Sequence, residues 1–77
     1  MNRIKEFRVE KGITQKELAS TVKLSIASIS YFERGVKRPS LLNAFKVANA
    51  LGTTVEELYP FMTIREGEPD NVPIKNR

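Results

Sequence analysis

The sequence predicts an all-α domain of five short helices, followed by a short tail that is irregular or forms a β-hairpin. Apolar residues recur at helical spacing through the first 59 residues. Stop signals follow most of these stretches: Gly12, Gly35 and Gly52 close three of them and Pro60 closes the last. A chain of 77 residues allows one small domain. We therefore expect a domain over residues 1–59 and a tail over residues 60–77.

The first two helices are expected near the amino terminus. Apolar spacing places the first over residues 2–11. The second begins at the capping box Thr14-Gln15-Lys16-Glu17, whose first hydroxyl and last carboxylate satisfy amide donors at a helix start. The break Lys23-Leu24-Ser25 ends this helix after about two turns. So short a helix needs neighbours to pack on.

A third, fourth and fifth helix are expected over residues 25–34, 40–51 and 54–59. A serine or threonine stands at the start of each, where its hydroxyl can accept a hydrogen bond from a helix amide. The start of the fifth helix repeats the capping-box pattern, with Thr54 and Glu57. The fourth helix carries the longest regular apolar stripe, which is interpreted as Leu42, Phe45, Ala48 and Leu51.

The composition changes after residue 59. Residues 60–77 hold three of the four prolines and the run Glu66-Gly67-Glu68-Pro69-Asp70-Asn71, which is typical of a turn. Apolar residues on both sides of this run allow a small β-hairpin, in which Pro73 restricts the second arm to an edge. Disorder of the tail is the favoured alternative.

Composition excludes most kinds of chemistry. The chain has no cysteine and no histidine, so disulfides, thiolate or imidazole metal sites and histidine-based triads are absent. No carboxylate pair is placed for acid-base catalysis, and no glycine loop resembles a phosphate site. We therefore expect no enzyme, no metal and no cofactor, and no small-molecule ligand is evident. No apolar stretch approaches the roughly 18 residues of a membrane span, so a cytoplasmic protein is expected.

The charge favours a polyanionic partner. Thirteen Lys and Arg stand against nine Asp and Glu, which gives a net charge of +4. The excess lies in the first two thirds of the chain, and residues 14–46 carry most of it. Such a balance favours a polyanionic partner without identifying it.

The second helix, the break and the third helix have the proportions of a helix-turn-helix. Five short motifs occur in order along the chain: Thr14-Gln15-Lys16-Glu17-Leu18-Ala19, Ser25-Ile26-Ala27-Ser28-Ile29-Ser30, Glu33-Arg34-Gly35, Pro39-Ser40-Leu41 and Ala50-Leu51-Gly52. Together they resemble the phage Cro and lambda-repressor type helix-turn-helix family, also called the xenobiotic response element (XRE) family. The resemblance covers about residues 3–59.

This resemblance implies a compact five-helix domain of the lambda-repressor type that binds DNA as a homodimer. The third helix, residues 25–34, would lie in the major groove of a palindromic operator. The implied function is sequence-specific transcriptional regulation by a cytoplasmic, nucleoid-associated protein of bacterial or phage type, and family habit favours a repressor.

Several buried contacts are also implied by the resemblance. Ala19 falls where two helices cross closely, and Ile29 and Phe32 match core positions. Arg8 and Glu33 match an ion pair that joins the first helix to the end of the third. The alternative for this pair is two solvated side chains, which would contribute little to stability.

One face of the third helix is expected to meet the bases, by family position and because Ile29 and Phe32 turn inward. Only Arg34 on this face is a long side chain of the kind that makes bidentate contacts with a base. Contacts with thymine methyl groups and readout of DNA shape are therefore expected. The residues of this face are Ser25, Ile26, Ala27, Ser30, Tyr31 and Arg34.

Candidate phosphate contacts flank that face. Thr14 and Gln15 start the second helix, where exposed amides and the positive end of the dipole can face a phosphate. Lys37 and Arg38 supply charge from the following loop. Lys16, Lys23 and Ser40 are further candidates. Lys23 also stands where the family commonly has a left-handed glycine, so either the turn is reshaped or some strain is tolerated.

The dimer contact implied by the resemblance lies near the fifth helix. It involves Val55, Tyr59, Phe61, Met62 and Ile64. A tail strand pairing across the two-fold axis and a tail packed on its own domain are both open.

A second function stays open as well. The outer face of the third helix is apolar for a base reader, so the domain could be a protein-interaction module that does not bind DNA directly. The net charge and the Lys37-Arg38 loop favour DNA.

Overall fold

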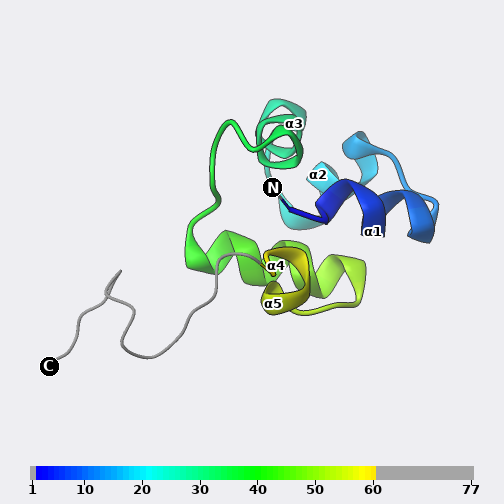
Figure 1. Ribbon diagram of the computed structural model, residues 1–77. Coiled ribbons are helices and arrows are strands. Elements are labelled where there is room, and N and C mark those ends of the chain that lie inside the picture. The colour runs from blue at the N-terminus through cyan, green and yellow to red at the C-terminus, as the bar shows by residue number, and fades with distance from the viewer. Residues whose placement is uncertain (1, 61–77) are drawn as a thin grey trace, which may run out of the picture.

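The computed structural model describes residues 2–60, and these form five α-helices (Figure 1). The predicted fold class and helix order are confirmed. The tail conformations and the tail residues Phe61, Met62 and Ile64 lie outside the described residues. The helices are α1 (Ile4–Lys11), α2 (Gln15–Val22), α3 (Ile26–Arg34), α4 (Leu41–Leu51) and α5 (Val55–Leu58).

A side-chain hydroxyl caps each of the last four helices, as the sequence predicts. The capping residues are Thr14, Ser25, Ser40 and Thr54. The capping box of α2 is complete, because the Glu17 amide donates to the Thr14 hydroxyl at 3.0 Å and the Thr14 amide to the Glu17 carboxylate at 2.8 Å. The predicted capping box of α5 is only half formed. The Glu57 amide donates to Thr54, but the Glu57 carboxylate accepts from the Thr53 hydroxyl.

The first helix begins at Ile4 and not at residue 2, because the residues before it are engaged elsewhere. The Asn2 side chain accepts from the Ile4 amide at 3.0 Å and donates to the Phe32 carbonyl at 2.7 Å. The Arg3 amide donates to the Leu58 carbonyl at 2.8 Å. The start of the chain therefore ties the ends of α3 and α5 together.

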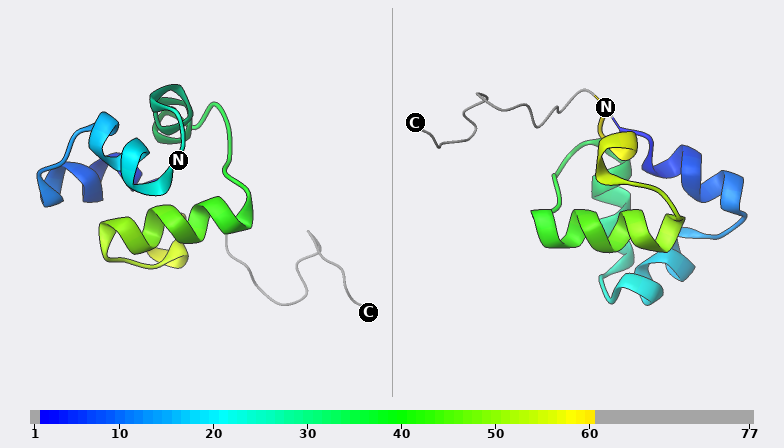
Figure 2. Two further views of the ribbon diagram at one scale, coloured as in Figure 1. Left: turned by 180° about the vertical axis from the view of Figure 1, so that it is seen from behind. Right: turned by 90° about the horizontal axis from the view of Figure 1, so that it is seen from below.

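The helices divide the domain into two sides. In Figure 1, α2 and α3 lie at the top and α4 and α5 at the bottom, with α1 beside them. α4 contacts α1, α2 and α5, whereas α3 contacts α1 and α2. The loop from Gly35 to Ser40 runs from the end of α3 to the start of α4 along one edge (Figure 2). The domain therefore has an α2–α3 side and an α4–α5 side.

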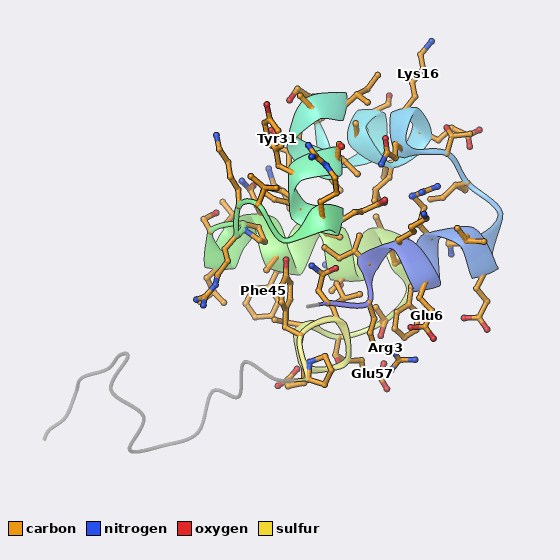
Figure 3. All side chains as sticks on the ribbon, turned by 45° about the horizontal axis from the view of Figure 1, so that its top comes forward. Arg3, Glu6, Lys16, Tyr31, Phe45 and Glu57 are labelled. Carbon is orange, nitrogen blue, oxygen red and sulfur yellow. The ribbon has the colours of Figure 1, made fainter. Side chains whose placement is uncertain are left out.

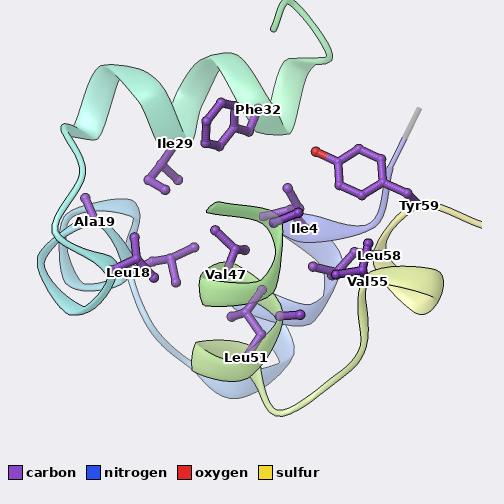
Figure 4. Packing of buried hydrophobic residues seen from close by; sticks show 13 residues of the cluster. Ile4, Leu18, Ala19, Ile29, Phe32, Val47, Leu51, Val55, Leu58 and Tyr59 are labelled. Carbon is purple, nitrogen blue, oxygen red and sulfur yellow. The ribbon is translucent and has the colours of Figure 1, made fainter. Parts of the chain in front are cut away.

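One apolar cluster holds the five helices together (Figure 4). Each helix contributes one side chain with no exposed surface, and burial of a side chain of this kind stabilises the fold by roughly 1.5 to 3 kcal/mol. These five residues are Ile4, Leu18, Ile29, Val47 and Leu58. Phe32 on α3 and Ala19 on α2 are also buried. The predicted core positions Ile29 and Phe32 are therefore confirmed, and Ala19 is buried at its expected helix crossing.

The apolar stripe predicted on α4 is half wrong. Leu42 and Phe45 are 65% and 53% exposed. Two sets of apolar residues occur on this helix at helical spacing, and the predicted stripe includes Leu42 and Phe45 from the set with the bulkier side chains. The set with the smaller side chains faces inward, because α4 packs closely on three other helices. The buried residues of α4 are Ala44, Val47, Ala48 and Leu51.

Lys23 closes α2 in a left-handed conformation, with φ 60° and ψ 45°. Among the described residues it is the non-glycine residue with a positive φ. The Leu24 amide donates to the Ala19 carbonyl at 2.9 Å, which completes the helix end. A side chain in this conformation costs roughly 1 kcal/mol or more. The turn therefore keeps the left-handed geometry and tolerates the strain.

A mostly buried ion pair joins α1 to α3. Arg8 Nε donates to Glu33 Oε2 at 2.5 Å and Arg8 Nη2 to Oε1 at 3.3 Å. The side chains are only 12% and 4% exposed. Arg8 Nη1 also donates to the Ile13 carbonyl at 2.8 Å, and Gln15 Nε2 donates to Glu33 Oε1 at 3.0 Å. Each charge is thus neutralised and hydrogen-bonded, as a buried pair requires.

Removing one charge of this pair should destabilise the domain severely. We predict that Glu33→Gln lowers the free energy of unfolding by about 3 to 5 kcal/mol, because the Arg8 charge would stay buried without its counterion. Glu6→Gln is the matched control, since it removes a carboxylate from the exposed Arg3–Glu6 pair and should change stability little. Urea unfolding followed by circular dichroism measures both. Similar losses in the two variants would contradict the prediction.

Candidate nucleic-acid interface

The predicted base-reading residues share the outer face of α3. Burial of Ile29 and Phe32 turns this face away from the core. Ser25, Ile26, Ala27 and Arg34 are exposed, and Ser30 and Tyr31 are half-buried. Tyr31 and Lys16 project from the α2–α3 side, whereas Phe45 and Glu57 lie on the α4–α5 side (Figure 3). The structure therefore brings the six candidates together on one accessible helix face.

Two serines on this face already have hydrogen-bond partners within the domain. The Ser25 hydroxyl accepts from the Ser28 amide at 3.0 Å and donates to the Ser28 hydroxyl at 2.9 Å. The Ser30 hydroxyl accepts from Arg34 Nε at 3.3 Å. Ser25 thus fixes the start of α3, and Ser30 helps to fix Arg34. At the amino-terminal end of the face, Ile26 and Ala27 present exposed apolar side chains.

An aromatic and cationic cluster forms at the other end of α3. The Arg34 guanidinium carbon lies 5.4 Å from the centre of the Tyr31 ring, and Lys37 Nζ lies 5.1 Å from it. Both distances are those of cation–π contacts. The Tyr31 carbonyl also accepts from the Val36 amide at 2.9 Å. This cluster was not predicted from the sequence, although the spacing of three residues between Tyr31 and Arg34 is a signal for the contact of these two side chains.

The start of α2 offers backbone donors next to this face. The first amides of a helix have no partner inside it. The capping box engages the amides of Thr14 and Glu17, which leaves those of Gln15 and Lys16 at the positive end of the helix dipole. The Gln15 side chain is held by Glu33 at 3.0 Å. Gln15 can therefore offer its backbone amide to an anion, while its side chain stays in the buried network.

The remaining phosphate candidates have different surroundings. Lys16, Lys23 and Lys37 are exposed. The Ser40 hydroxyl accepts from the Asn43 amide at 3.1 Å as the cap of α4. Arg38 is exposed, but it lies on the α4–α5 side of the loop, where it lines a pocket.

That pocket has a volume of about 210 Å³ and lies between the loop and the starts of α4 and α5. Val55 and Tyr59, which the sequence reading placed at a dimer contact, form part of its wall and are only 9% and 6% exposed. Burial raises the pKa of Tyr59, and the positive charge of Arg38 opposes part of that rise. The lining residues are Arg38, Pro39, Leu41, Ala44, Val55, Glu56 and Tyr59.

Other kinds of site find no support in residues 2–60. That stretch contains no group of three or more His, Cys, Asp or Glu side chains that could hold a metal ion. None of its helices has both the length and the apolar character needed to cross a membrane.

Comparison with known proteins gives a consistent result. Residues 4–58 match a family model described as "Helix-turn-helix". An uncharacterized HTH-type transcriptional regulator of Archaeoglobus fulgidus is 41% identical over 59 residues, which are 77% of this chain and 84% of that protein. YgzD, an uncharacterized HTH-type transcriptional regulator of Bacillus subtilis, is 33% identical over 58 residues, or 75% and 88% of the two chains.

The HTH-type transcriptional regulator DdrOP3 of Deinococcus deserti is 36% identical over 56 residues, which are 73% of this chain and 43% of DdrOP3. These similar proteins come from archaea as well as bacteria. The similarity therefore does not support the expected bacterial or phage origin.

Proposed function

Because the chain belongs to the helix-turn-helix family of the Cro and lambda-repressor type, whose members are DNA-binding transcriptional regulators and not enzymes, we propose that it binds a palindromic operator as a homodimer. In this proposal α3 enters the major groove and the bound protein represses transcription. It acts in the cytoplasm, on nucleoid DNA. The observation that carries the proposal is the accessible outer face of α3, flanked by the start of α2 and by exposed lysines.

Base recognition would be divided along α3. Ile26, which is 46% exposed, and Ala27 are suited to contact thymine methyl groups. Arg34 is the long donor that can make a bidentate contact with guanine, and its contacts with Ser30 and Tyr31 restrict its position before binding. The Ser25 hydroxyl is engaged as a helix cap, so its share of base recognition would be small. Much of the specificity would come from DNA shape.

Phosphate contacts would position the domain on the duplex. The Gln15 and Lys16 amides at the start of α2 are suited to bind a phosphate oxygen, and Thr14 orients them through its capping box. The exposed side chains of Lys16 and Lys37 would add positive charge on this side, whereas Lys23 lines a hollow with Lys46 and Asn49 of α4 and is a more distant candidate. Ser40 and Arg38 stand at the far end of the loop and are the more distant candidates.

A protein-binding role is the alternative, because Ile26 is an exposed apolar side chain on the face that should meet the bases. The neighbouring lysines argue against it, since interface centres are depleted of charge. DNA binding is therefore the function that the geometry supports best.

Selection from a random duplex pool tests the proposal directly. The expected product is an inverted repeat with half-sites about one helical turn apart. Affinity for this duplex should fall steeply between two salt concentrations, as counterion release requires. A pool without enrichment, together with weak binding at physiological salt, would reject DNA recognition and favour a protein partner.

The roles of individual residues can be separated on the selected duplex. We predict that Tyr31→Leu changes the preference among related operators, because Arg34 loses the ring that restrains it, whereas Tyr31→Phe keeps the ring and the preference. Lys16→Ala should weaken all sequences evenly and reduce the salt slope by about 1. Competition binding to the operator and its single-base variants measures both effects. Equal losses on every sequence for Tyr31→Leu and Lys16→Ala would contradict this division of roles.

A further inference from the structure

Within residues 2–60, the Tyr59 hydroxyl is the buried side-chain polar atom that has no hydrogen-bond partner. The residue is only 6% exposed, and its ring extends from the end of α5 towards α3 (Figure 4). Tyr59 also forms part of the wall of the pocket between the loop and the starts of α4 and α5. A buried donor without an acceptor is costly, and such a group in a native fold needs a physical reason. A ligand that brings an acceptor into this pocket would supply one.

The pocket has the make-up of a site for a small molecule. Its volume of about 210 Å³ is below the roughly 300 to 1,000 Å³ of pockets that hold drug-sized ligands. Most of its wall is apolar, and a few polar groups accompany that wall, as is usual where a small molecule binds. The apolar lining residues are Pro39, Leu41, Ala44 and Val55. The pocket therefore suits a small ligand with an apolar part.

Two opposite charges line the same pocket. Arg38 and Glu56 are both exposed there. The charge of Arg38 is close enough to the Tyr59 phenol to oppose part of the rise in its pKa. Within the described chain no ion pair joins Arg38 to Glu56. A ligand with one positive and one negative group would satisfy both side chains at once.

From these observations we propose that the pocket binds a free α-amino acid with an apolar side chain. In this complex the Arg38 guanidinium donates to the carboxylate of the ligand, and the Glu56 carboxylate accepts from its ammonium group. The Tyr59 hydroxyl donates to a carboxylate oxygen and so gains its missing partner. The apolar side chain of the ligand lies against Leu41 and Val55, where it is removed from water.

The proposed site is separate from the surface that is proposed to meet DNA. The pocket lies on the α4–α5 side, whereas Tyr31 and Lys16 project from the α2–α3 side (Figure 3). Binding of the amino acid therefore needs no DNA, and the site does not rest on the proposed function.

Titration of the full chain with L-leucine tests the site. Isothermal titration calorimetry should show one leucine bound per chain, with saturation at millimolar concentrations or below. Isocaproate is leucine without its ammonium group, and isoamylamine is leucine without its carboxylate. Each should bind about tenfold more weakly or worse, because each leaves Arg38 or Glu56 without its counterpart and facing a like charge.

Tyr59→Phe distinguishes a ligand contact from a structural role, because it removes the hydroxyl and keeps the ring in the pocket wall. The thermal midpoint of the free protein should hold or rise, since an unpartnered buried hydroxyl is lost, while the dissociation constant for leucine should rise several-fold. Arg38→Gln and Glu56→Gln should each raise it about tenfold or more. Tyr31→Phe and Lys37→Gln are the matched controls, because neither residue lines the pocket, and both should bind leucine like the unaltered chain.

Three results would overturn the proposal. One is the absence of saturable leucine binding, which is also what a pocket filled by residues 61–64 or by a second copy would give. Another is equal affinity for leucine and isocaproate, and the third is unchanged leucine affinity in all three pocket variants. Specific leucine binding by a chain that enriches no duplex would instead support this site and reject the proposed function.

Discussion

The buried contact between Arg8 and Glu33 is the interaction on which the rest of the domain depends. It joins α1 to the end of α3, and its remaining hydrogen bonds reach the Ile13 carbonyl and the Gln15 side chain at the start of α2. The same network therefore fixes the two segments at which DNA contact is proposed. Apolar packing alone is non-directional. A pair of charges that cannot be left uncompensated holds the end of α3 against α1, and the Gln15 hydrogen bond to Glu33 extends this constraint to the start of α2.

The placement of these helices decides which polar groups are engaged within the domain and which remain available to a ligand. Hydroxyls that could have faced a ligand are used as helix caps, as Thr14, Ser25 and Ser40 show. The outer face of α3 is left with small and apolar side chains at one end and with the Tyr31 cluster at the other. In the proposed complex, this face would read methyl groups and groove shape more than hydrogen-bond patterns. Its α4–α5 side carries apolar surface, which suits a protein partner.

Local rules predicted much of this fold from the sequence. Hydroxyl caps and stop residues located the helices, and the inward turn of Ile29 and Phe32 located the outer face of α3. Features that depend on tertiary contacts were missed or needed a family resemblance. Arg8 and Glu33 are 25 residues apart, so helical spacing alone did not pair them. The α4 stripe failed because both faces of that helix carry apolar residues, and only packing against three neighbours decides between them.

Affinity cleavage from α3 tests the central claim most directly. The chain has no cysteine, so Ala27→Cys creates a single attachment point for a DNA-cleaving reagent on the face proposed to enter the groove. On the selected duplex we predict cuts inside each half-site, at positions facing the major groove. Glu6→Cys, on the other side of the domain (Figure 3), should give no localised cuts. Equal patterns from the two positions, or no cutting from Ala27→Cys despite binding, would contradict the placement of α3 in the groove.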